Sequence, residues 1–84
     1  MTYSNYVPNN LRPLREQAGL RQLDVANALG LVSSDRISHW EIGWAVPNIV
    51  NLFKLSVLYK VPPQKLYEQL FQTVEDEMRH AASI

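Results

Sequence analysis

The sequence predicts an all-α fold, a small bundle of five helices with an extended C-terminal helix. Apolar residues recur every three or four positions in five segments, the spacing that gives a helix one apolar face. No segment alternates apolar and polar residues convincingly, as a half-buried strand would. Glycine or proline marks the boundaries of the segments and leaves loops of only a few residues, as a compact helical bundle needs.

Two short helices open the predicted bundle. The first covers residues 11–18, with Asn10 as its N-cap and Gly19 as its end. The second covers residues 22–29 and stops at Gly30.

The third predicted helix has a core side and an outward side. It begins near Ser34, with Ser33 as its cap, and ends at Gly43. At about 100° per residue, Ile37 and Trp40 point together toward the core. The opposite side carries Asp35, His39 and Ile42.

Two longer helices complete the prediction. The fourth covers residues 49–59, and a Val-Pro-Pro break at residues 61–63 separates it from a fifth over residues 64–82. One face of the fourth helix is expected to enter the core. That face contains Ile49, Leu52, Leu55 and Tyr59.

Length and composition exclude several classes of protein. A chain of 84 residues has room for one domain and one modest hydrophobic core. The absence of cysteine excludes disulfides, thiolate metal sites and cysteine nucleophiles. No apolar run is long enough to span a membrane, and the polar start, residues 1–10, does not resemble a signal peptide. We therefore expect a cytoplasmic protein with no membrane contact.

The charge balance does not by itself favour nucleic acid. The 8 basic and 8 acidic residues give a formal net charge of zero, whereas nucleic-acid binders usually carry a basic surplus. Four of the acids gather toward the C-terminus, and without them the rest of the chain is net basic. These four are Glu68, Glu75, Asp76 and Glu77.

Two stretches carry a family resemblance. GLRQLDVANALGLVSSDRISHWEIG, residues 19–43, resembles the core of the Cro and phage-repressor (XRE-type) helix-turn-helix family. VPNIVNLFKLSVLYKVPPQKL, residues 46–66, is similar to the fourth helix of that family and the start of its fifth. The resemblance implies a lambda-repressor-like DNA-binding domain over residues 11–70. A polar arm, residues 1–10, precedes it, and residues 71–84 extend the last helix as a possible dimerisation element.

The resemblance also implies roles for individual residues. In this fold the second helix of the pair enters the major groove of DNA while the first crosses the backbone. The positions that would read base edges are Ser34, Asp35 and His39. The positions that would flank them or meet phosphates are Arg21, Gln22, Ser33, Arg36 and Ser38. Arg15 and Glu41 match a pair that forms a partly buried salt bridge, and the alternative is two exposed charges.

The chain departs from the family pattern in three places. One extra residue, within Leu31-Val32, precedes the third helix, so the assignments over residues 33–36 hold only to within one position. Arg21 stands where the family usually has a Ser or Thr cap. The loop after Gly43 has Trp44, Ala45 and Val46 where the family offers phosphate-binding residues. Fewer phosphate contacts predict a weaker electrostatic contribution to binding.

Surplus apolar residues on the last two helices suggest an interface. A monomer would not readily leave so large an apolar surface exposed to water. The candidate positions are Val50, Phe53, Val57, Leu70, Phe71, Val74 and Met78. The long helix either folds back over the fourth helix or forms a two-fold dimer interface. We favour a homodimer, because paired half-sites on DNA require two recognition helices.

Three functions remain, in decreasing order of support. The first is a sequence-specific regulator of transcription that binds double-stranded DNA and represses by occupying its operator. The second is an antitoxin-like or adaptor module on the same fold, with a protein partner. An enzyme is the least supported, because no phosphate loop, metal cluster or catalytic set is recognisable. No cofactor is expected, and Asp35 with His39 provides too few ligands for a metal site.

Overall fold

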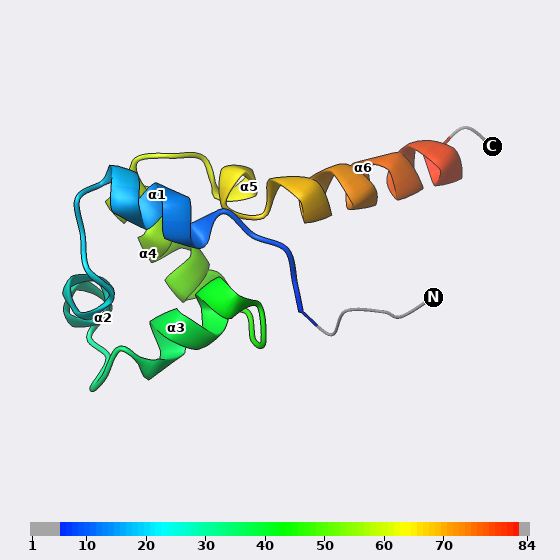
Figure 1. Ribbon diagram of the computed structural model, residues 1–84. Coiled ribbons are helices and arrows are strands. Elements are labelled where there is room, and N and C mark those ends of the chain that lie inside the picture. The colour runs from blue at the N-terminus through cyan, green and yellow to red at the C-terminus, as the bar shows by residue number, and fades with distance from the viewer. Residues whose placement is uncertain (1–5, 83–84) are drawn as a thin grey trace.

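The computed structural model describes residues 6–82, and every regular element in that range is a helix (Figure 1). The elements are α1 (Leu11–Gln17), α2 (Gln22–Leu29), α3 (Asp35–Ile42), α4 (Ile49–Tyr59), α5 (Pro63–Leu66) and α6 (Glu68–Ala82). The first five cluster together, and α6 projects away from them (Figure 1). The predicted all-α fold is therefore confirmed.

The hydrophobic core draws one face from each of the first five helices. Its members are Leu11, Leu14, Val25, Ala26, Leu29, Ile37, Trp40, Leu55, Tyr59, Leu66 and Tyr67. Ile37 and Trp40 are buried as the helical spacing predicts. The prediction for Ile49 was wrong. This residue is 66% exposed, because it begins α4 beyond the last turn of α3 and only the later turns of α4 reach the core.

Side-chain caps differ from one helix to the next. Asn48 caps α4 in the usual way, since its Oδ1 accepts a hydrogen bond from the Asn51 amide at 2.8 Å. Asn10 occupies the N-cap position of α1, but its side chain does not cap that helix. Its Nδ2 instead donates to the Lys65 carbonyl at 3.0 Å, and its own amide donates to the Leu66 carbonyl at 2.9 Å. Asn10 thus ties α1 to α5.

The single helix predicted over residues 64–82 is in fact two. Tyr67 leaves the helical region, with φ −131° and ψ 52°, and separates α5 from α6. Leu66 and Tyr67 are both buried, at 0% and 9% exposure. Neighbouring residues of a straight helix point about 100° apart, so the break allows both side chains to enter the same core. It also sets the direction in which α6 leaves the bundle.

Replacement of Tyr67 by phenylalanine is expected to stabilise the protein. The Tyr67 hydroxyl is buried and has no hydrogen-bond partner among the described residues, so Tyr67→Phe should raise the free energy of unfolding by about 1 kcal/mol at pH 7. Burial also raises the pKa of Tyr67 from 10.0 to about 12. The unfolded chain therefore loses this proton first, and stability falls as the pH rises from 10 to 12.

Urea unfolding at pH 7 and pH 11 measures both effects. The variant should lose less stability between the two pH values than the parent does. Part of the loss should remain, because burial also raises the pKa of Tyr59. A variant that is less stable at pH 7 would show that the hydroxyl has an unrecognised partner, and one that is equally sensitive to alkali would show that folding does not raise the pKa of Tyr67.

Candidate nucleic-acid interface

A tight turn fixes the angle between α2 and α3. Gly30 ends α2 in the left-handed region at φ 76°, and the Leu31 amide donates to the Ala26 carbonyl at 2.9 Å. Val25 and Ala26 are fully buried, which allows α2 to approach the rest of the bundle closely. The pair lies at one edge of the molecule (Figure 1). One side of α3 is therefore free of contact with the other helices.

The outward side of α3 is polar and mostly exposed. Asp35, Arg36 and His39 are exposed, and Ser34 and Ser38 are half-buried. At the start of the helix the Asp35 amide donates to Ser33 Oγ at 3.3 Å, although Ser34 is the N-cap residue by position. The structure thus brings all the sequence-predicted positions of this segment together on or beside the exposed face of α3.

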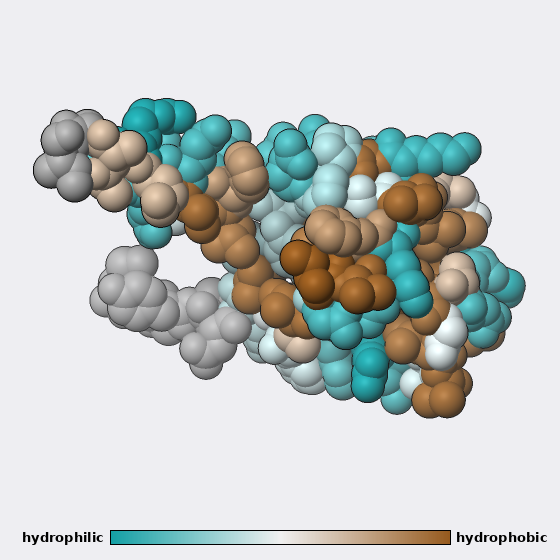
Figure 2. Space-filling view, turned by 180° about the vertical axis from the view of Figure 1, so that it is seen from behind, coloured by the Kyte–Doolittle hydropathy of each residue, from teal (hydrophilic) through white to brown (hydrophobic). Residues whose placement is uncertain are grey.

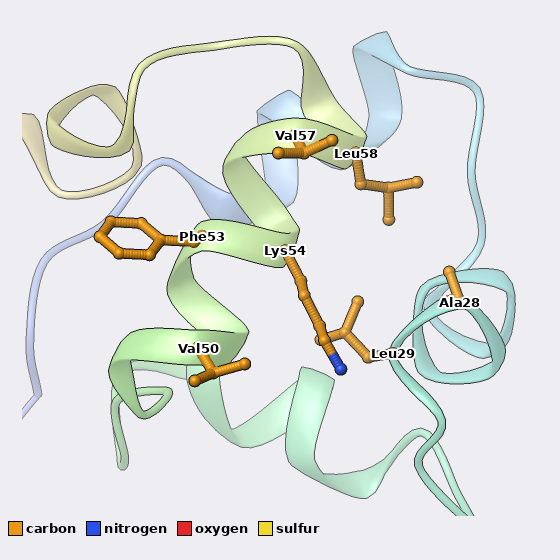
Figure 3. Close-up of a pocket in the computed structure, with 7 residues that line it drawn as sticks. All are labelled: Ala28, Leu29, Val50, Phe53, Lys54, Val57 and Leu58. Atoms are coloured by element: carbon orange, nitrogen blue, oxygen red, sulfur yellow. The ribbon is translucent and has the colours of Figure 1, made fainter.

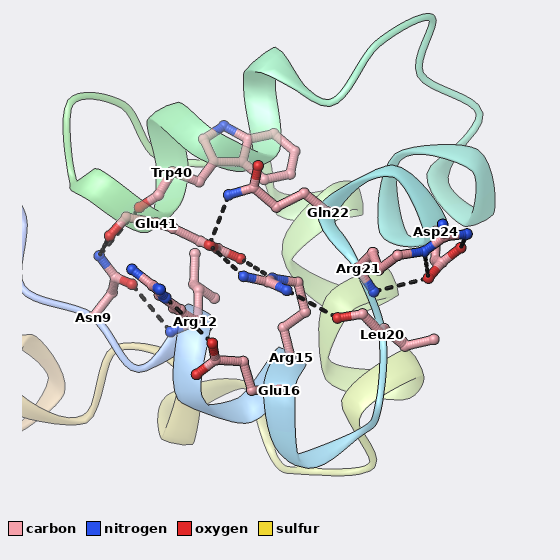
Figure 4. A network of polar contacts seen from close by, with 11 residues as sticks. Asn9, Arg12, Arg15, Glu16, Leu20, Arg21, Gln22, Asp24, Trp40 and Glu41 are labelled. Atoms are coloured by element: carbon pink, nitrogen blue, oxygen red, sulfur yellow. Dashed lines mark hydrogen bonds and ion pairs between the residues drawn. The ribbon is translucent and has the colours of Figure 1, made fainter.

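A buried ion pair ties α1 to the end of α3 (Figure 4). Arg15 Nε lies 2.6 Å from Glu41 Oε2, and Arg15 Nη2 lies 3.2 Å from Oε1. The two side chains are only 11% and 4% exposed. A third donor, Gln22 Nε2, reaches Glu41 Oε1 at 3.0 Å, and Arg15 Nη1 donates to the Leu20 carbonyl at 2.9 Å. The hydrogen bonds that Arg15 donates to Glu41 raise the pKa of Arg15.

This network engages a side chain that was predicted to contact phosphate. Gln22 begins α2, where the resemblance places a side chain on phosphate. In the structure its side-chain amide points inward to Glu41. What remains at this helix start is the backbone, because the first amides of a helix have no partner within the helix and favour anions.

Arg21 also has a partner within the chain. Its Nη2 lies 2.9 Å from Asp24 Oδ1 and its Nε lies 3.1 Å from Oδ2, so the guanidinium is held by two bonds (Figure 4). The Arg21 amide donates to the same carboxylate at 2.8 Å, which is the half of a capping box that the residue at N3 supplies. The pair raises the pKa of Arg21 and lowers that of Asp24. The positive charge of Arg21 is therefore already balanced by Asp24 and is less available to a phosphate.

Few cations are left for phosphate. Of the 8 lysine and arginine side chains, all within the described residues, Arg12, Arg15, Arg21, Lys65 and Arg79 form ion pairs. Within the described part of the chain, no ion pair is formed by Arg36, Lys54 or Lys60. Among these three, Arg36 alone lies on α3. The composition has no basic surplus, and the internal ion pairs further reduce the number of cations available to phosphate.

An aromatic stack supports His39. Its ring lies 5.3 Å from the ring of Trp44, and Trp44 in turn stacks on Tyr6 at 6.3 Å. Trp44 is 58% exposed and follows the end of α3 directly. The stack restricts the ring of His39 on the outward face. Sequence analysis did not predict this contact between Trp44 and His39.

The N-terminal strap, residues 6–10, holds the C-terminal end of α3. The Val7 amide donates to the Gly43 carbonyl at 2.8 Å. Asn9 Nδ2 lies 3.1 Å from the Trp40 carbonyl and 3.2 Å from that of Glu41, so it satisfies carbonyls that a helix end leaves unpaired. The sequence left the order of this arm undecided. Its one signal was the Asn9-Asn10 pair, because asparagine readily bonds nearby backbone. Residues 1–5 of the predicted arm lie outside the described residues.

The candidate interface residues fall on two separate surfaces. Val50, Phe53 and Val57 are exposed along α4. They border the α2–α4 hollow, a depression of about 510 Å³ whose lining is Ala28, Leu29, Val50, Phe53, Lys54, Val57 and Leu58 (Figure 3). Leu70, Phe71 and Val74 border a second depression of about 470 Å³ at the base of α6, and Met78 lies further along that helix. No residue of α6 is buried, so α6 does not fold back over α4.

None of the helices described has the length and apolar character needed to cross a membrane. No group of three or more potential metal ligands comes together among residues 6–82.

Comparison with known proteins identifies the family. A search of curated proteins finds no match to this chain. The family model described as helix-turn-helix matches residues 11–66, which includes α1 to α5 and two thirds of the chain. The match covers the α2–α3 pair and the helices that support it. The chain therefore belongs to the Cro and phage-repressor (XRE) helix-turn-helix family, a family of DNA-binding regulators.

Proposed function

We propose that the protein binds double-stranded DNA in a sequence-specific manner and represses transcription by occupying its operator. The observation that carries this proposal is the exposed face of α3, anchored from behind by the buried Ile37 and Trp40. A helix presented in this way can enter the major groove. As a regulator of this kind, the protein would act in the cytoplasm.

The proposed base-reading residues are Ser34, Asp35 and His39. A carboxylate such as that of Asp35 can accept from cytosine N4, a hydroxyl adapts to several bases, and an imidazole can meet guanine or adenine edges. Arg36 lies between them and is free to read guanine or to meet phosphate, because it has no ion pair within the described residues. Ser33 and Ser38 would flank these contacts, and the start of α2, with Arg21 and Gln22, would meet the backbone.

We propose further that two copies bind together. Two recognition helices can occupy half-sites about 34 Å apart only if the protein pairs. The exposed apolar residues of α4 and α6 support pairing, since they are more numerous than a monomer usually leaves in water.

Selection of bound sites from random duplex DNA tests the function directly. A palindromic consensus with half-sites one helical turn apart is the expected result. On that consensus, Arg36→Ala and His39→Ala should each weaken binding by about tenfold in a fluorescence anisotropy titration. Arg12→Ala, which removes an exposed arginine from α1, is the matched control and should leave the affinity unchanged. Equal losses in all three variants would contradict a specific role for α3.

Release of Arg21 from its partner should strengthen DNA binding. Asp24→Asn removes a negative charge from the start of α2 and frees the Arg21 guanidinium for phosphate. We expect about one more phosphate contact per copy, which makes the slope of log affinity against log salt steeper by about 0.9 per copy. Glu16→Gln frees Arg12 on α1 with the same change in net charge. If both variants steepen the slope equally, net charge and not the place of Arg21 is the cause.

A second candidate, a protein-interaction module of the antitoxin or adaptor kind, is favoured by one observation. Most cations of the chain are paired internally, while two apolar depressions are open to solvent. The same titration separates the two functions. Affinity that falls steeply as salt rises supports the regulator, whereas no binding at low salt supports the interaction module.

A further inference from the structure

The apolar residues of α6 have the spacing of a helix–helix seam. Phe71, Val74, Met78 and Ala81 follow one another at intervals of three, four and three residues, which keeps them on one side of a helix that pairs with another. Phe71, Val74 and Met78 are 47%, 47% and 62% exposed. The helix has 15 residues and is about 22 Å long, and the seam takes up about 15 Å of that length. The described part of the chain does not cover this seam.

Charge argues against a second α6 as the partner of this seam. Its flanking positions carry Glu68, Glu75 and Glu77, and paired α6 helices would bring these carboxylates together. The one arginine of α6, Arg79, is held by Glu75 at 3.6 Å and by Asp76 at 3.3 Å. The surface that fits α6 is therefore apolar and carries a positive charge.

The α2–α4 hollow has these properties. Its lining is apolar except for Lys54, which comes from α4 and whose ammonium group lies beside Leu29 of α2 (Figure 3). No acidic residue occurs in α4. Lys54 forms no ion pair within residues 6–82, and the same is true of Glu77 on α6. The hollow thus has an unpaired positive charge, and the seam is flanked by an unpaired negative charge.

The hollow and the seam cannot meet within one chain. Figure 1 places α2 and the far end of α6 on opposite sides of the molecule. Apolar side chains run along α6 and gather over the middle of the same face of the bundle (Figure 2). One face of the molecule carries both the hollow and the seam. A single two-fold axis can therefore place the seam of each copy against the hollow of the other.

We propose that α6 of each copy lies in the α2–α4 hollow of a second copy, with Glu77 of one copy beside Lys54 of the other. The exchange is reciprocal, so every dimer contains the contact twice. This inference rests on the proposed homodimer and names its surfaces, but it does not depend on DNA binding.

Charge reversal tests the pairing in the absence of DNA. In sedimentation equilibrium at low salt we expect the parent protein to be a dimer at micromolar concentration. Lys54→Glu and Glu77→Lys should each raise the dissociation constant at least about tenfold, since each places like charges together at both contacts. The double variant should return to the parent value. An equimolar mixture of the single variants should also form dimers, because the heterodimer restores opposite charges at both contacts.

Asp76→Lys is the matched control, because it makes the same charge change on α6 away from the seam. It should leave the dissociation constant unchanged. A monomeric parent, a double variant as weak as the single ones, or a single variant without effect would each overturn the exchange. Titration of each variant with a duplex containing one half-site keeps the two proposals apart. Loss of that binding with association intact contradicts the proposed function, and the reverse result contradicts the exchange alone.

Discussion

Glu41→Ala should lower the free energy of unfolding by about 3–5 kcal/mol. The substitution removes the carboxylate that accepts from Arg15 Nε, Arg15 Nη2 and Gln22 Nε2. It leaves a guanidinium that is 11% exposed without a counter-charge. Urea unfolding followed by far-ultraviolet circular dichroism measures the change through the transition midpoint.

Two comparisons make that result specific. Glu16→Ala breaks the ion pair with Arg12, whose side chains are 70% and 56% exposed, and it should cost less than about 1 kcal/mol. A double variant with Arg15→Met and Glu41→Leu removes both charges and should be more stable than Glu41→Ala alone. If Glu41→Ala costs no more than Glu16→Ala, the pair does not stabilise the fold.

Gly43→Ala should be nearly as damaging, for a reason of backbone geometry. Gly43 ends α3 at φ 98°, where a side chain costs about 1–2 kcal/mol. A Cβ there would lie 2.6 Å from the Val7 carbonyl oxygen and 2.8 Å from its nitrogen. The strap would have to move, at a further cost of about 1–3 kcal/mol. Thermal unfolding measures the loss of stability, and hydrogen exchange at the Val7 amide reports the release of the strap.

Gly30→Ala is the control for that substitution. Gly30 ends α2 at φ 76°, but no atom lies within 4 Å of the position that its Cβ would take. Its substitution should therefore cost only the backbone strain of about 1–2 kcal/mol. Equal losses in the two variants would show that contact with the strap does not matter.

The sequence predicted the helices better than their interruptions. The bounds of α4 agree with the predicted residues 49–59, because a proline and a capping asparagine precede it and a strong apolar period runs through it. The break at Tyr67 was missed, since two adjacent apolar residues do not reveal that both will be buried. The side chain of Asn10 was misassigned, because its acceptor lies 55 positions away.

The sequence predicted which face of α3 points outward. It did not predict which polar groups around that face are free to bind a ligand. Helical spacing alone places Asp35 and His39 outward. It does not reveal that Gln22 donates a hydrogen bond to Glu41, 19 positions along the chain. Nor does it reveal that the strap donates to a carbonyl at the end of α3 that is more than 30 positions away. Which polar groups remain available to a ligand depends on such competition within the folded chain.

The two tryptophans give the protein a built-in optical readout. Trp40 is 4% exposed in the core, while Trp44 is 58% exposed beside His39 at the end of α3. Trp40→Phe and Trp44→Phe each leave a single tryptophan. Fluorescence of the first variant would follow docking of a ligand against α3, and fluorescence of the second would follow loss of the folded interior, with no attached dye.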